Sequence, residues 1–413
     1  MTRVALMPSS YLPALGGVEE LTRHLALALR AAGDEVEIWV GTANSGDPPH
    51  VEELDGFVVR RLPLPLPARR ASSMARLIAR LPAAATAMRS ALRAFRPDLL
   101  HVQCFGPNGV YATGLALLTR VPLVVTLQGE TVMDDHDIFE TSSIMRAGLR
   151  TGLRVADAVT ACSTFTLADA DRFGLDRSKA SVIFNGVDLG GADPAAEGPA
   201  AEGPACQRGQ VAPGRSPVPP ELGGKLSSDR YLFALGRVVE KKGFDLLIRA
   251  FAAVVPDFET DLVVAGDGRE LPALVRLAED LGIDSRVVFP GRLSREEVAQ
   301  AMASAEALVV PSRLEPFGIV VLEGWRAGVA VIATSIGGPP EFVKDGETGL
   351  LVDPFDAGAF EEALRKVLSD DVLRRHLATR GRRAVEEFDW PRVASRYRAC
   401  YQSVSAGSRR SGG

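Results

Sequence analysis

Short apolar runs alternate with helical stretches along the first half of the chain. Runs with the character of buried strands lie at residues 4–7, 36–40, 57–62, 99–102, 123–127, 158–161 and 181–184. After the first run, Gly16 and Gly17 open a helix whose apolar residues recur at helical spacing until Gly33 ends it. Strands that alternate with helices in this way predict a parallel, doubly wound α/β sheet.

The same pattern starts again at residue 231. Strands are predicted at residues 231–235, 262–265, 286–289, 307–310 and 331–334, with helices between them. Because 413 residues exceed what one ordinary core holds, we expect two Rossmann-like domains, at residues 1–188 and 231–385. Residues 386–413 are predicted to form a helical tail that crosses back to the first domain.

Residues 189–230 interrupt this pattern. They contain the sequence Ala-Glu-Gly-Pro-Ala twice, many Pro and Gly residues, and few large apolar side chains. Such a segment cannot bury enough apolar surface to order itself, so we predict a flexible linker insertion. A rigid polyproline spacer is the alternative, which the glycines disfavour.

Composition narrows the class of protein. The net charge of -5 gives no general attraction to nucleic acid, and we expect no nucleic-acid partner. The four cysteines are scattered without metal-site spacing, which favours a reducing, cytoplasmic location. The first apolar run is cut off by Pro8, so it is not a signal peptide, and no run approaches the roughly 20 residues that span a bilayer.

Residues 60–96 depart from this acidic balance, because they contain many arginines and no Asp or Glu. The arginines are Arg60, Arg61, Arg69, Arg70, Arg76, Arg80, Arg89, Arg93 and Arg96. They could bind anionic lipid, which would place the protein peripherally at the inner membrane face, or attract a phosphorylated acceptor. The alternative is an outer helix with solvated arginines. A nucleic-acid site is disfavoured because no aromatic residues are interleaved.

The segment from Glu315 to Glu323 carries the most specific chemistry. It follows the predicted strand at residues 307–310, and a Pro-Phe-Gly turn leads from it into an apolar helical run. Gly318 is small enough for a ligand to approach the backbone, and free amides at a helix start favour an anion. The two carboxylates can accept hydrogen bonds from hydroxyls. A phosphate joined to a polyol, as in a nucleotide-sugar, fits this pattern.

A basic turn follows the predicted strand at residues 231–235. Arg237 can hold phosphate oxygens in a fork, and Lys242 adds a point charge. A solvated surface loop is the commoner explanation of such a turn. Because the carboxyl ends of parallel strands form the ligand-binding edge, its place near the Glu315 segment favours a phosphate site.

Taken together, these motifs resemble those of family 4 retaining glycosyltransferases, which have the GT-B fold. The matching pieces span nearly the whole chain in the order Gly16 to Glu19, Phe184 to Asp188, Gly236 to Gly243, Val264 to Gly268, Glu315 to Glu323 and Gly337 to Glu341. The resemblance implies two facing Rossmann-like, doubly wound parallel-sheet domains with a cleft between them. It also implies a donor mainly in the second domain and an acceptor mainly in the first.

The resemblance further implies a role for each donor-side residue. Catalytic roles fall to Arg237 and Lys242, which would stabilise the leaving diphosphate, and to Glu315, which would contact the transferred sugar. Glu323 would accept from the ribose hydroxyls; its alternative is an exposed helix carboxylate, and that of Glu315 is a helix N-cap. The remaining donor-binding residues are Gly16, Gly17, Gly291, Arg292, Leu293, Phe317, Gly318 and Ile319.

The acceptor side departs from the family pattern. The strand ending near residue 126 often leads to a His in this family, whereas this chain has Gln128, which cannot take a proton at neutral pH. Attack on the donor from the side of the leaving group, with the departing phosphate as proton acceptor, tolerates that change. Glu130 is a candidate polar contact or base, or an ordinary surface residue. His101 is a candidate acceptor contact, although a buried structural His is favoured.

We expect no cofactor and no metal. The run from Asp134 to Asp137 is a candidate metal site, because hard cations bind clustered carboxylates. The resemblance implies instead that cationic side chains and helix ends meet the charge of the diphosphate. A charged loop on the acceptor side is the preferred interpretation.

The function predicted from the resemblance is retaining transfer of a hexosyl group from a nucleotide-diphosphate sugar, with UDP- or GDP-sugars favoured. The acceptor would be a hydroxyl on a glycolipid, a small molecule or a natural-product precursor. Two alternatives stay open, a nucleotide-sugar epimerase of related fold and a non-catalytic sugar-nucleotide-binding subunit. The first should not need an acceptor alcohol to act, and the presence of Glu315, Glu323, Arg237 and Lys242 disfavours the second.

Overall fold

The computed structural model describes residues 1–13, 16–42, 47–65, 71–134, 137–190, 222 and 224–410, with backbone only at residues 71–79 and 407–410. These residues form two compact units. Unit 1 comprises Met1–Asp188 together with Phe388–Gly413, and unit 2 comprises Leu189–Glu387. The predicted linker lies almost entirely outside the described residues. Within the described part of the chain, no helix is both long and apolar enough to cross a membrane.

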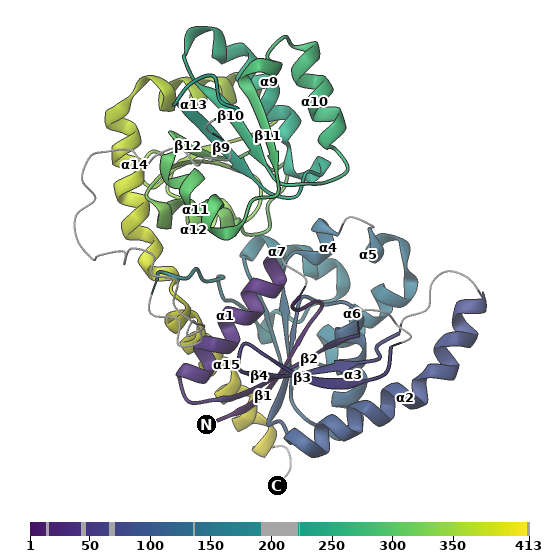
Figure 1. Ribbon diagram of the computed structural model, residues 1–413. Helices are drawn as coiled ribbons and strands as arrows, with labels where there is room; N and C mark the ends of the chain where they lie inside the picture. Colours follow the sequence, from purple (N-terminus) through teal and green to yellow (C-terminus); the bar gives the residue numbers. More distant parts are fainter. Residues whose placement is uncertain are drawn as a thin grey trace. The chain divides into compact units, whose positions relative to one another are not determined.

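Unit 1 is built on one twisted sheet (Figure 1). Its strands are β1 (Arg3–Pro8), β2 (Glu35–Gly41), β3 (His50–Leu54), β4 (Phe57–Leu62), β5 (Leu99–Gln103), β6 (Leu123–Leu127), β7 (Ala158–Ala161) and β8 (Ala180–Val182). They lie in the order β3-β4-β2-β1-β5-β6-β7-β8, and every pair is parallel except β3 with β4. The chain direction across the sheet reverses between β1 and β5, the point where such sheets bind ligands.

The predicted strands of unit 1 are confirmed, but β3 was missed. It pairs with β4 through a turn at Asp55 and Gly56, whose φ values are 53° and 70°. Two positive φ values define the turn that Asp-Gly favours in a two-residue hairpin. The strand β3 has no apolar pattern in the sequence, because it lies at the edge of the sheet and buries few side chains.

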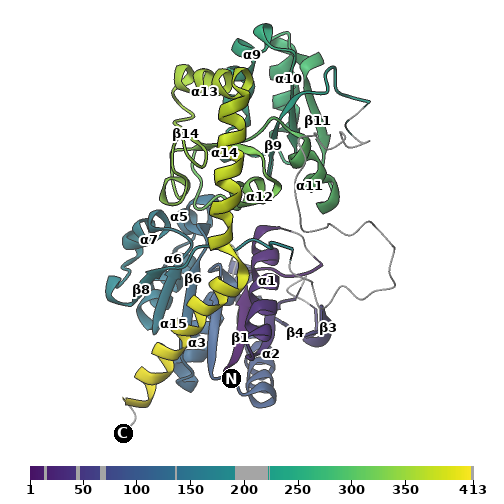
Figure 2. The same ribbon diagram turned by 90° about the vertical axis from the view of Figure 1, so that its left-hand side faces the viewer.

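Helices cover both faces of the sheet in unit 1. They are α1 (Gly17–Ala31), α2 (Ala71–Phe95), α3 (Pro107–Thr119), α4 (Glu130–Met133), α5 (Ile138–Thr141), α6 (Ser143–Val155), α7 (Thr164–Ala170) and α15 (Trp390–Arg410). On one face, Leu100 and Val102 of β5 belong to the same apolar cluster as residues of α2, α3, α6 and α7. On the other face α1 and α15 lie side by side (Figure 2).

The C-terminal helix α15 is therefore an integral part of unit 1. Its first residue, Trp390, stacks on His24 of α1 with ring centroids 5.7 Å apart. A Cβ on Gly186 would come within 2.8 Å of the same indole, so a glycine is needed at this contact. Further along the helix, Arg398 donates to Asp34 at 2.8 Å. These contacts fix α15 to the middle of α1 and to the residues that follow α1.

Unit 2 has a fully parallel sheet. Its strands are β9 (Tyr231–Leu235), β10 (Asp261–Ala265), β11 (Val287–Gly291), β12 (Ala307–Val310), β13 (Ala330–Thr334) and β14 (Leu350–Val352), in the order β11-β10-β9-β12-β13-β14. Its helices are α9 (Phe244–Val254), α10 (Leu271–Asp280), α11 (Arg295–Ser304), α12 (Ile319–Ala327), α13 (Ala357–Ser369) and α14 (Asp371–Ala384). The predicted strands are confirmed; the short β14 was not predicted.

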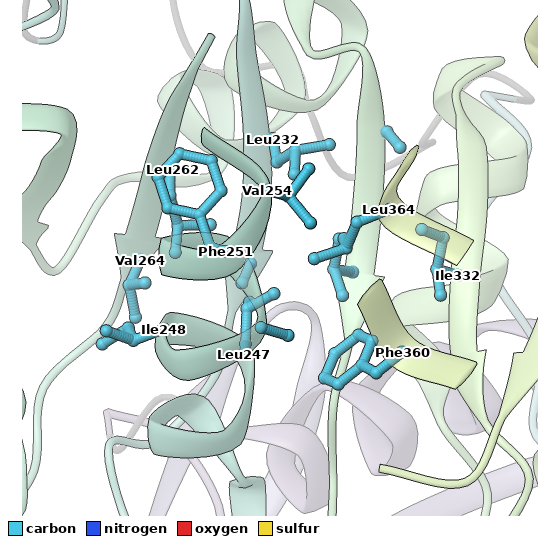
Figure 3. Packing of buried hydrophobic residues seen from close by; sticks show 14 of the residues in the cluster. Leu232, Leu247, Ile248, Phe251, Val254, Leu262, Val264, Ile332, Phe360 and Leu364 are labelled. Carbon is cyan, nitrogen blue, oxygen red and sulfur yellow. The ribbon is translucent and has the colours of Figure 1, made fainter. Parts of the chain in front are cut away.

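The core of unit 2 lies between α9, α13 and the sheet (Figure 3). Phe251 and Leu247 of α9 face Leu262 and Leu232 of the strands, and Phe360 of α13 fills the adjoining space. All five side chains are essentially inaccessible to water. Burying a side chain of this size contributes about 1.5–3 kcal/mol, so this layer fixes the strands whose ends carry the site.

Short 3-10 turns complete the described structure. They are η1 (Asp171–Phe173), η2 (Arg177–Lys179), η3 (Glu240–Lys242), η4 (Val255–Asp257), η5 (Asp284–Arg286), η6 (Pro339–Glu341) and η7 (Val385–Phe388). Two of them, η3 and η6, belong to the loops described next.

Candidate functional site

Three loops of unit 2 leave the carboxyl ends of β9, β12 and β13, which are neighbours in the sheet. They carry the basic turn with Lys242, the segment with Glu315, and the pair Gly337-Gly338. The sheet therefore brings together three of the segments that the sequence singled out. In a doubly wound sheet, this edge is where ligands bind.

Glu315 joins two of these loops. Lys242 Nζ lies 2.6 Å from Glu315 Oε2, and Ser312 Oγ donates to the same oxygen at 2.9 Å. The Glu315 side chain is buried, yet its Oε1 accepts no hydrogen bond from any described residue. Glu315 is not a helix N-cap, because Gly318 holds that position without a side-chain bond. One carboxylate oxygen is thus held by a cation, and the other remains an acceptor.

Glycines bring the Glu315 loop and the following loop into backbone contact. Gly337 has φ 115°, and a Cβ there would lie 2.0 Å from the carbonyl oxygen of Glu315. Gly338 N donates to the same carbonyl at 2.8 Å, and its own Cβ would lie 2.3 Å from Pro316 O. No other residue type fits this approach, because any side chain would meet backbone.

The helix α12 begins directly after this contact. Gly318 precedes it with φ 92°, in the left-handed region that suits glycine. The amides of Ile319 and Val320 have no hydrogen-bond partner among the described residues. Such amides, with the positive end of the helix dipole, form an anion-binding site. The Phe317 ring packs on Phe342 at 5.0 Å, so only the backbone of Phe317 can face a ligand.

The basic turn is held by a similar close contact. A Cβ on Gly243 would lie 2.1 Å from Pro311 O, and Arg313 N donates to Lys241 O at 3.0 Å. Lys242 is largely buried, whereas Arg237 is exposed at the end of β9. The fold therefore fixes the position of Lys242 beside its acid, whereas the exposed Arg237 side chain can adjust to a ligand.

The other donor-side residues lie near the same sheet edge or on unit 1. Glu323 is half-buried on α12, four residues after Ile319. The turn of Gly291, Arg292 and Leu293 ends β11, on the far side of β10, and the Arg292 side chain is 81 % exposed.

Gly16 and Gly17 begin α1 in unit 1. Gly16 is the N-cap in extended backbone and has no side-chain cap bond. A Cβ on Gly16 would meet Glu19 Oε2 at 2.8 Å. Glu19 therefore leaves little space for a side chain at Gly16, where α1 begins.

In unit 1, His101 lies inside the molecule. It is fully buried on the face of β5 that α15 covers, and burial lowers the pKa of its imidazole to about 3. Its Nδ1 lies 2.7 Å from Tyr401 Oη, and its Nε2 lies 2.7 Å from Thr126 Oγ1. A neutral ring with both nitrogens occupied favours the structural interpretation of this residue.

Gln128 is held at the carboxyl end of β6. Its Nε2 donates to Gln103 Oε1 at 3.2 Å and to Asn185 Oδ1 at 3.1 Å, and its Oε1 accepts from Asn185 Nδ2 at 2.9 Å. Sequence reasoning assigned no role to Gln103 or Asn185. The motif from Phe184 to Asp188 contains Asn185, and it was the one sequence signal that could have pointed to this residue.

Glu130 is not an ordinary surface residue. It is half-buried, and its carboxylate accepts the backbone N–H of Phe105 at 2.5 Å and that of Gln128 at 2.6 Å. Burial raises the pKa of this carboxyl to about 7, because desolvation outweighs the two amide bonds. Glu130 thus fastens together the loops that follow β5 and β6.

A cavity of about 460 Å³ opens at the carboxyl ends of β1, β2 and β4. It is lined by Ser9, Ser10, Tyr11, Pro13, Val40, Gly41, Thr42, Arg61, Leu64, Pro107 and Asn108. Arg61 pairs with Glu52 at 2.6 Å and also donates to Leu12 O, so its guanidinium is fixed at the cavity wall. Apolar surface exceeds polar surface in this lining, and the polar groups that it does offer can bond to a hydroxylated ligand.

The arginine-rich stretch divides into two groups. Arg60 binds Glu37 through two hydrogen bonds of 2.6 and 2.8 Å, and Arg61 is paired with Glu52, so neither is a loose surface charge. Arg89, Arg93 and Arg96 are exposed on or just after α2. Arg69 and Arg70 lie outside the described residues, as does the side chain of Arg76.

The acidic run at residues 134–137 is described only in part. Asp134 accepts the backbone N–H of Ile138 at 2.5 Å, which caps α5, whereas Asp135 and His136 lie outside the described residues. Over the described ranges, no group of three or more His, Cys, Asp or Glu side chains is arranged to hold a metal ion.

Comparison with known families agrees with the two units. The family model described as "Glycosyl transferases group 1" matches residues 223–384, and that of the "Glycosyl transferase 4-like domain" matches residues 16–186. Together they cover well over half of the chain. The D-inositol 3-phosphate glycosyltransferase of Streptomyces avermitilis is 29% identical, over 96% of this chain and 84% of its own.

Solved structures show the same fold. Sucrose-phosphate synthase from Thermosynechococcus elongatus has a TM-score of 0.75 at 24% identity, covering 98% of this chain and 100% of its own. Anabaena HepE in complex with UDP and glucose has a TM-score of 0.71 at 19% identity, with the same coverage of 98% and 100%. Two parallel-sheet α/β units with these likenesses have the GT-B fold, and the chain belongs to the family 4, or group 1, glycosyltransferases.

Proposed function

We propose that this glycosyltransferase moves a hexosyl group, with retention of configuration, from a UDP-sugar to a hydroxyl acceptor. The observation that carries the proposal is the Lys242–Glu315 pair beside the first amides of α12, which no described residue accepts from. It puts a fixed cation and a helix N-terminus next to a carboxylate oxygen that still accepts. A sugar diphosphate offers the anion and the hydroxyls that this arrangement fits.

The diphosphate would bind the amides of Ile319 and Val320 together with Lys242 and Arg237. As the bond from the anomeric carbon to the phosphate oxygen breaks, these groups would stabilise the charge that grows on the phosphate. One well-aimed donor contributes about 3–4 kcal/mol to such a transition state. These cationic and dipolar groups support transfer without a metal, so EDTA should leave the rate unchanged.

Glu315 Oε1 would accept a hydrogen bond from a hydroxyl of the transferred sugar, and Glu323 would accept from the ribose. The acceptor oxygen would form its new bond on the face that the phosphate leaves, which retains the configuration. Its proton would pass to the departing phosphate oxygen. His101 is buried, and the Glu130 carboxylate is occupied by two backbone amides, which supports this route over one that uses either side chain as the base.

Two similar proteins suggest the donor and acceptor classes. UDP is favoured because HepE, a protein of the same fold, was solved with UDP and glucose. A small polyol phosphate is one acceptor class to test, since a relative acts as a D-inositol 3-phosphate glycosyltransferase. Unit 1 offers such an acceptor a cavity with a fixed arginine in its wall.

Two measurements test the proposal. Thermal unfolding with UDP-, GDP-, ADP- and dTDP-sugars should show one that stabilises the protein, by about 2.7 kcal/mol at 100 times its dissociation constant. That donor should then release nucleotide when an acceptor alcohol is added. Conversion of the donor without any acceptor would support the epimerase alternative instead. If Glu315→Gln left turnover of the same donor and acceptor unchanged, the catalytic role of Glu315 would be wrong.

A further inference from the structure

A continuous chain of buried hydrogen bonds runs from α15 to the carboxyl end of β6. Tyr401 Oη lies 2.7 Å from His101 Nδ1, and His101 Nε2 lies 3.4 Å from Gln103 Nε2. Gln103 Oε1 accepts from Gln128 Nε2 at 3.2 Å, and Gln128 exchanges two bonds with Asn185. Residues 300 positions apart in the sequence are thus joined within unit 1.

Burial makes this chain continuous. Tyr401, His101, Gln103 and Asn185 are each at least nine-tenths buried, so water cannot replace a missing partner. A buried donor or acceptor that loses its partner pays the full cost of desolvation. Each member therefore restricts the orientation of the next.

The directions of the hydrogen bonds are mutually consistent. Because the Gln103 carbonyl oxygen accepts from Gln128, the Gln103 amide nitrogen faces His101 Nε2. An amide nitrogen only donates, so Nε2 presents its lone pair to the Gln103 amide and to the Thr126 hydroxyl 2.7 Å away, and the imidazole proton on Nδ1 donates to Tyr401 Oη. The burial that keeps the ring neutral preserves this single arrangement.

Gln128 is the least buried member of the chain and stands at the ligand-binding edge of the sheet. Its Nε2 protons both go to protein acceptors, and its Oε1 accepts one bond from Asn185. One lone pair of Oε1 is left, since a carbonyl oxygen has two. The side chain can therefore accept one O–H and can orient a hydroxyl without taking its proton.

We propose that His101 and Tyr401 are positioning residues that aim the Gln128 carbonyl at the acceptor hydroxyl. The idea rests on the proposed function, because it assumes that the acceptor binds unit 1. The contacts of Trp390 and Arg398 hold α15 in place. The helix α15 in turn fixes the position of Tyr401, at the far end of the hydrogen-bonded chain. The last helix of the protein thereby orients a side chain in the acceptor site.

The first test removes one hydroxyl. Tyr401→Phe should raise the KM for the acceptor about tenfold and leave the KM for the donor within about twofold, because one lost hydrogen bond of about 1.4 kcal/mol is a factor of ten. Tyr231→Phe is the matched control: the Tyr231 hydroxyl is also buried and donates to Ala301 O at 2.7 Å, but it lies in unit 2. The control should lower the melting temperature and leave both KM values unchanged.

The second test asks whether Tyr401 acts through Gln128. In that case Tyr401→Phe combined with Gln128→Ala should show the acceptor KM of Gln128→Ala alone. Additive effects, or equal changes of acceptor KM in Tyr401→Phe and Tyr231→Phe, would overturn the proposal.

A third readout does not depend on activity. Nitrogen-15 NMR of the wild-type protein should show His101 protonated on Nδ1, and Tyr401→Phe should shift the Gln128 side-chain amide signals whereas Tyr231→Phe should not. Unmoved Gln128 signals would overturn the positioning role. If those signals moved but the wild type transferred no sugar from any donor, the proposed function alone would have failed.

Discussion

Unit 1 and unit 2 have the same doubly wound architecture but build their sites by different means. In unit 2, glycines press loop backbones together, and an ion pair with a helix start supplies the charge. In unit 1, neutral side chains buried under a helix make a hydrogen-bonded chain that ends at the sheet edge. Backbone contacts and fixed charges suit the diphosphate, an anionic group that does not vary between donors. A network of side chains can differ between enzymes that use different acceptors. The two units should therefore respond differently to mutation.

The largest effect is expected from Lys242→Ala in unit 2. The change removes the cation proposed to meet the diphosphate and leaves the buried Glu315 carboxylate without its partner. We expect kcat to fall by about 10²–10³ in steady-state assays. Arg313→Gln is the control, because it breaks another ion pair of unit 2, with Asp245 at 2.7 Å, at a more exposed position. A similar loss in both variants would mean that ion pairs in unit 2 act only on stability.

Glycine substitutions test whether close backbone contact is required in unit 2. Gly337→Ala should destabilise the protein by about 2–4 kcal/mol, since the new Cβ would overlap Glu315 O in addition to straining the backbone. Gly328→Ala shares the positive φ, at 73°, but meets nothing within 4 Å, so about 1 kcal/mol is expected. Urea unfolding measures both. Equal losses would show that only backbone strain matters.

Unit 1 should show a dependence on pH that unit 2 lacks. Because burial raises the pKa of the Glu130 carboxyl from its ordinary value of 4.5 to about 7, the folded state binds the proton more tightly. Stability from this group is therefore full below pH 4.5 and is lost as the pH rises to 7, with a slope of up to about 1.4 kcal/mol per pH unit. Urea unfolding between pH 4.5 and 8 should show this slope in the wild type. Glu130→Gln should flatten it; an unchanged slope would assign it to another group.

The smallest effect concerns the exposed arginines of unit 1. If α2 contacts anionic membranes, replacing Arg89, Arg93 and Arg96 by Gln should weaken binding to phosphatidylglycerol vesicles by about 1 kcal/mol for each charge. Sedimentation at low and high salt measures this, with phosphatidylcholine vesicles as the control. Binding that is absent at low salt, or that ignores the substitutions, would identify these arginines as solvated surface.

The sequence was sufficient to predict both sheets because their strands are apolar runs with clear boundaries. It failed at β3, whose polar edge position leaves no apolar pattern, although Asp55 and Gly56 marked its turn. The loops of unit 2 could be predicted because glycines and charges leave a local signature. The partners of Gln128 could not, since Gln103 and Asn185 come from distant strands and nothing near them records the contact. The role of Tyr401 depends on where the last helix docks.

The position of α15 also has a consequence for how the protein is made. A ribosome completes residues 1–188 long before it reaches Trp390, so the face of the sheet that carries His101 and Thr126 must wait for its cover. Until then, the polar groups that later bond to Tyr401 and Tyr397 stay accessible to water and to chaperones. Unit 2 has all of its strands and packing helices in one continuous stretch, so it can finish folding first although it is synthesised second. A chain truncated just before residue 390 would therefore have a complete second unit and an unfinished first one.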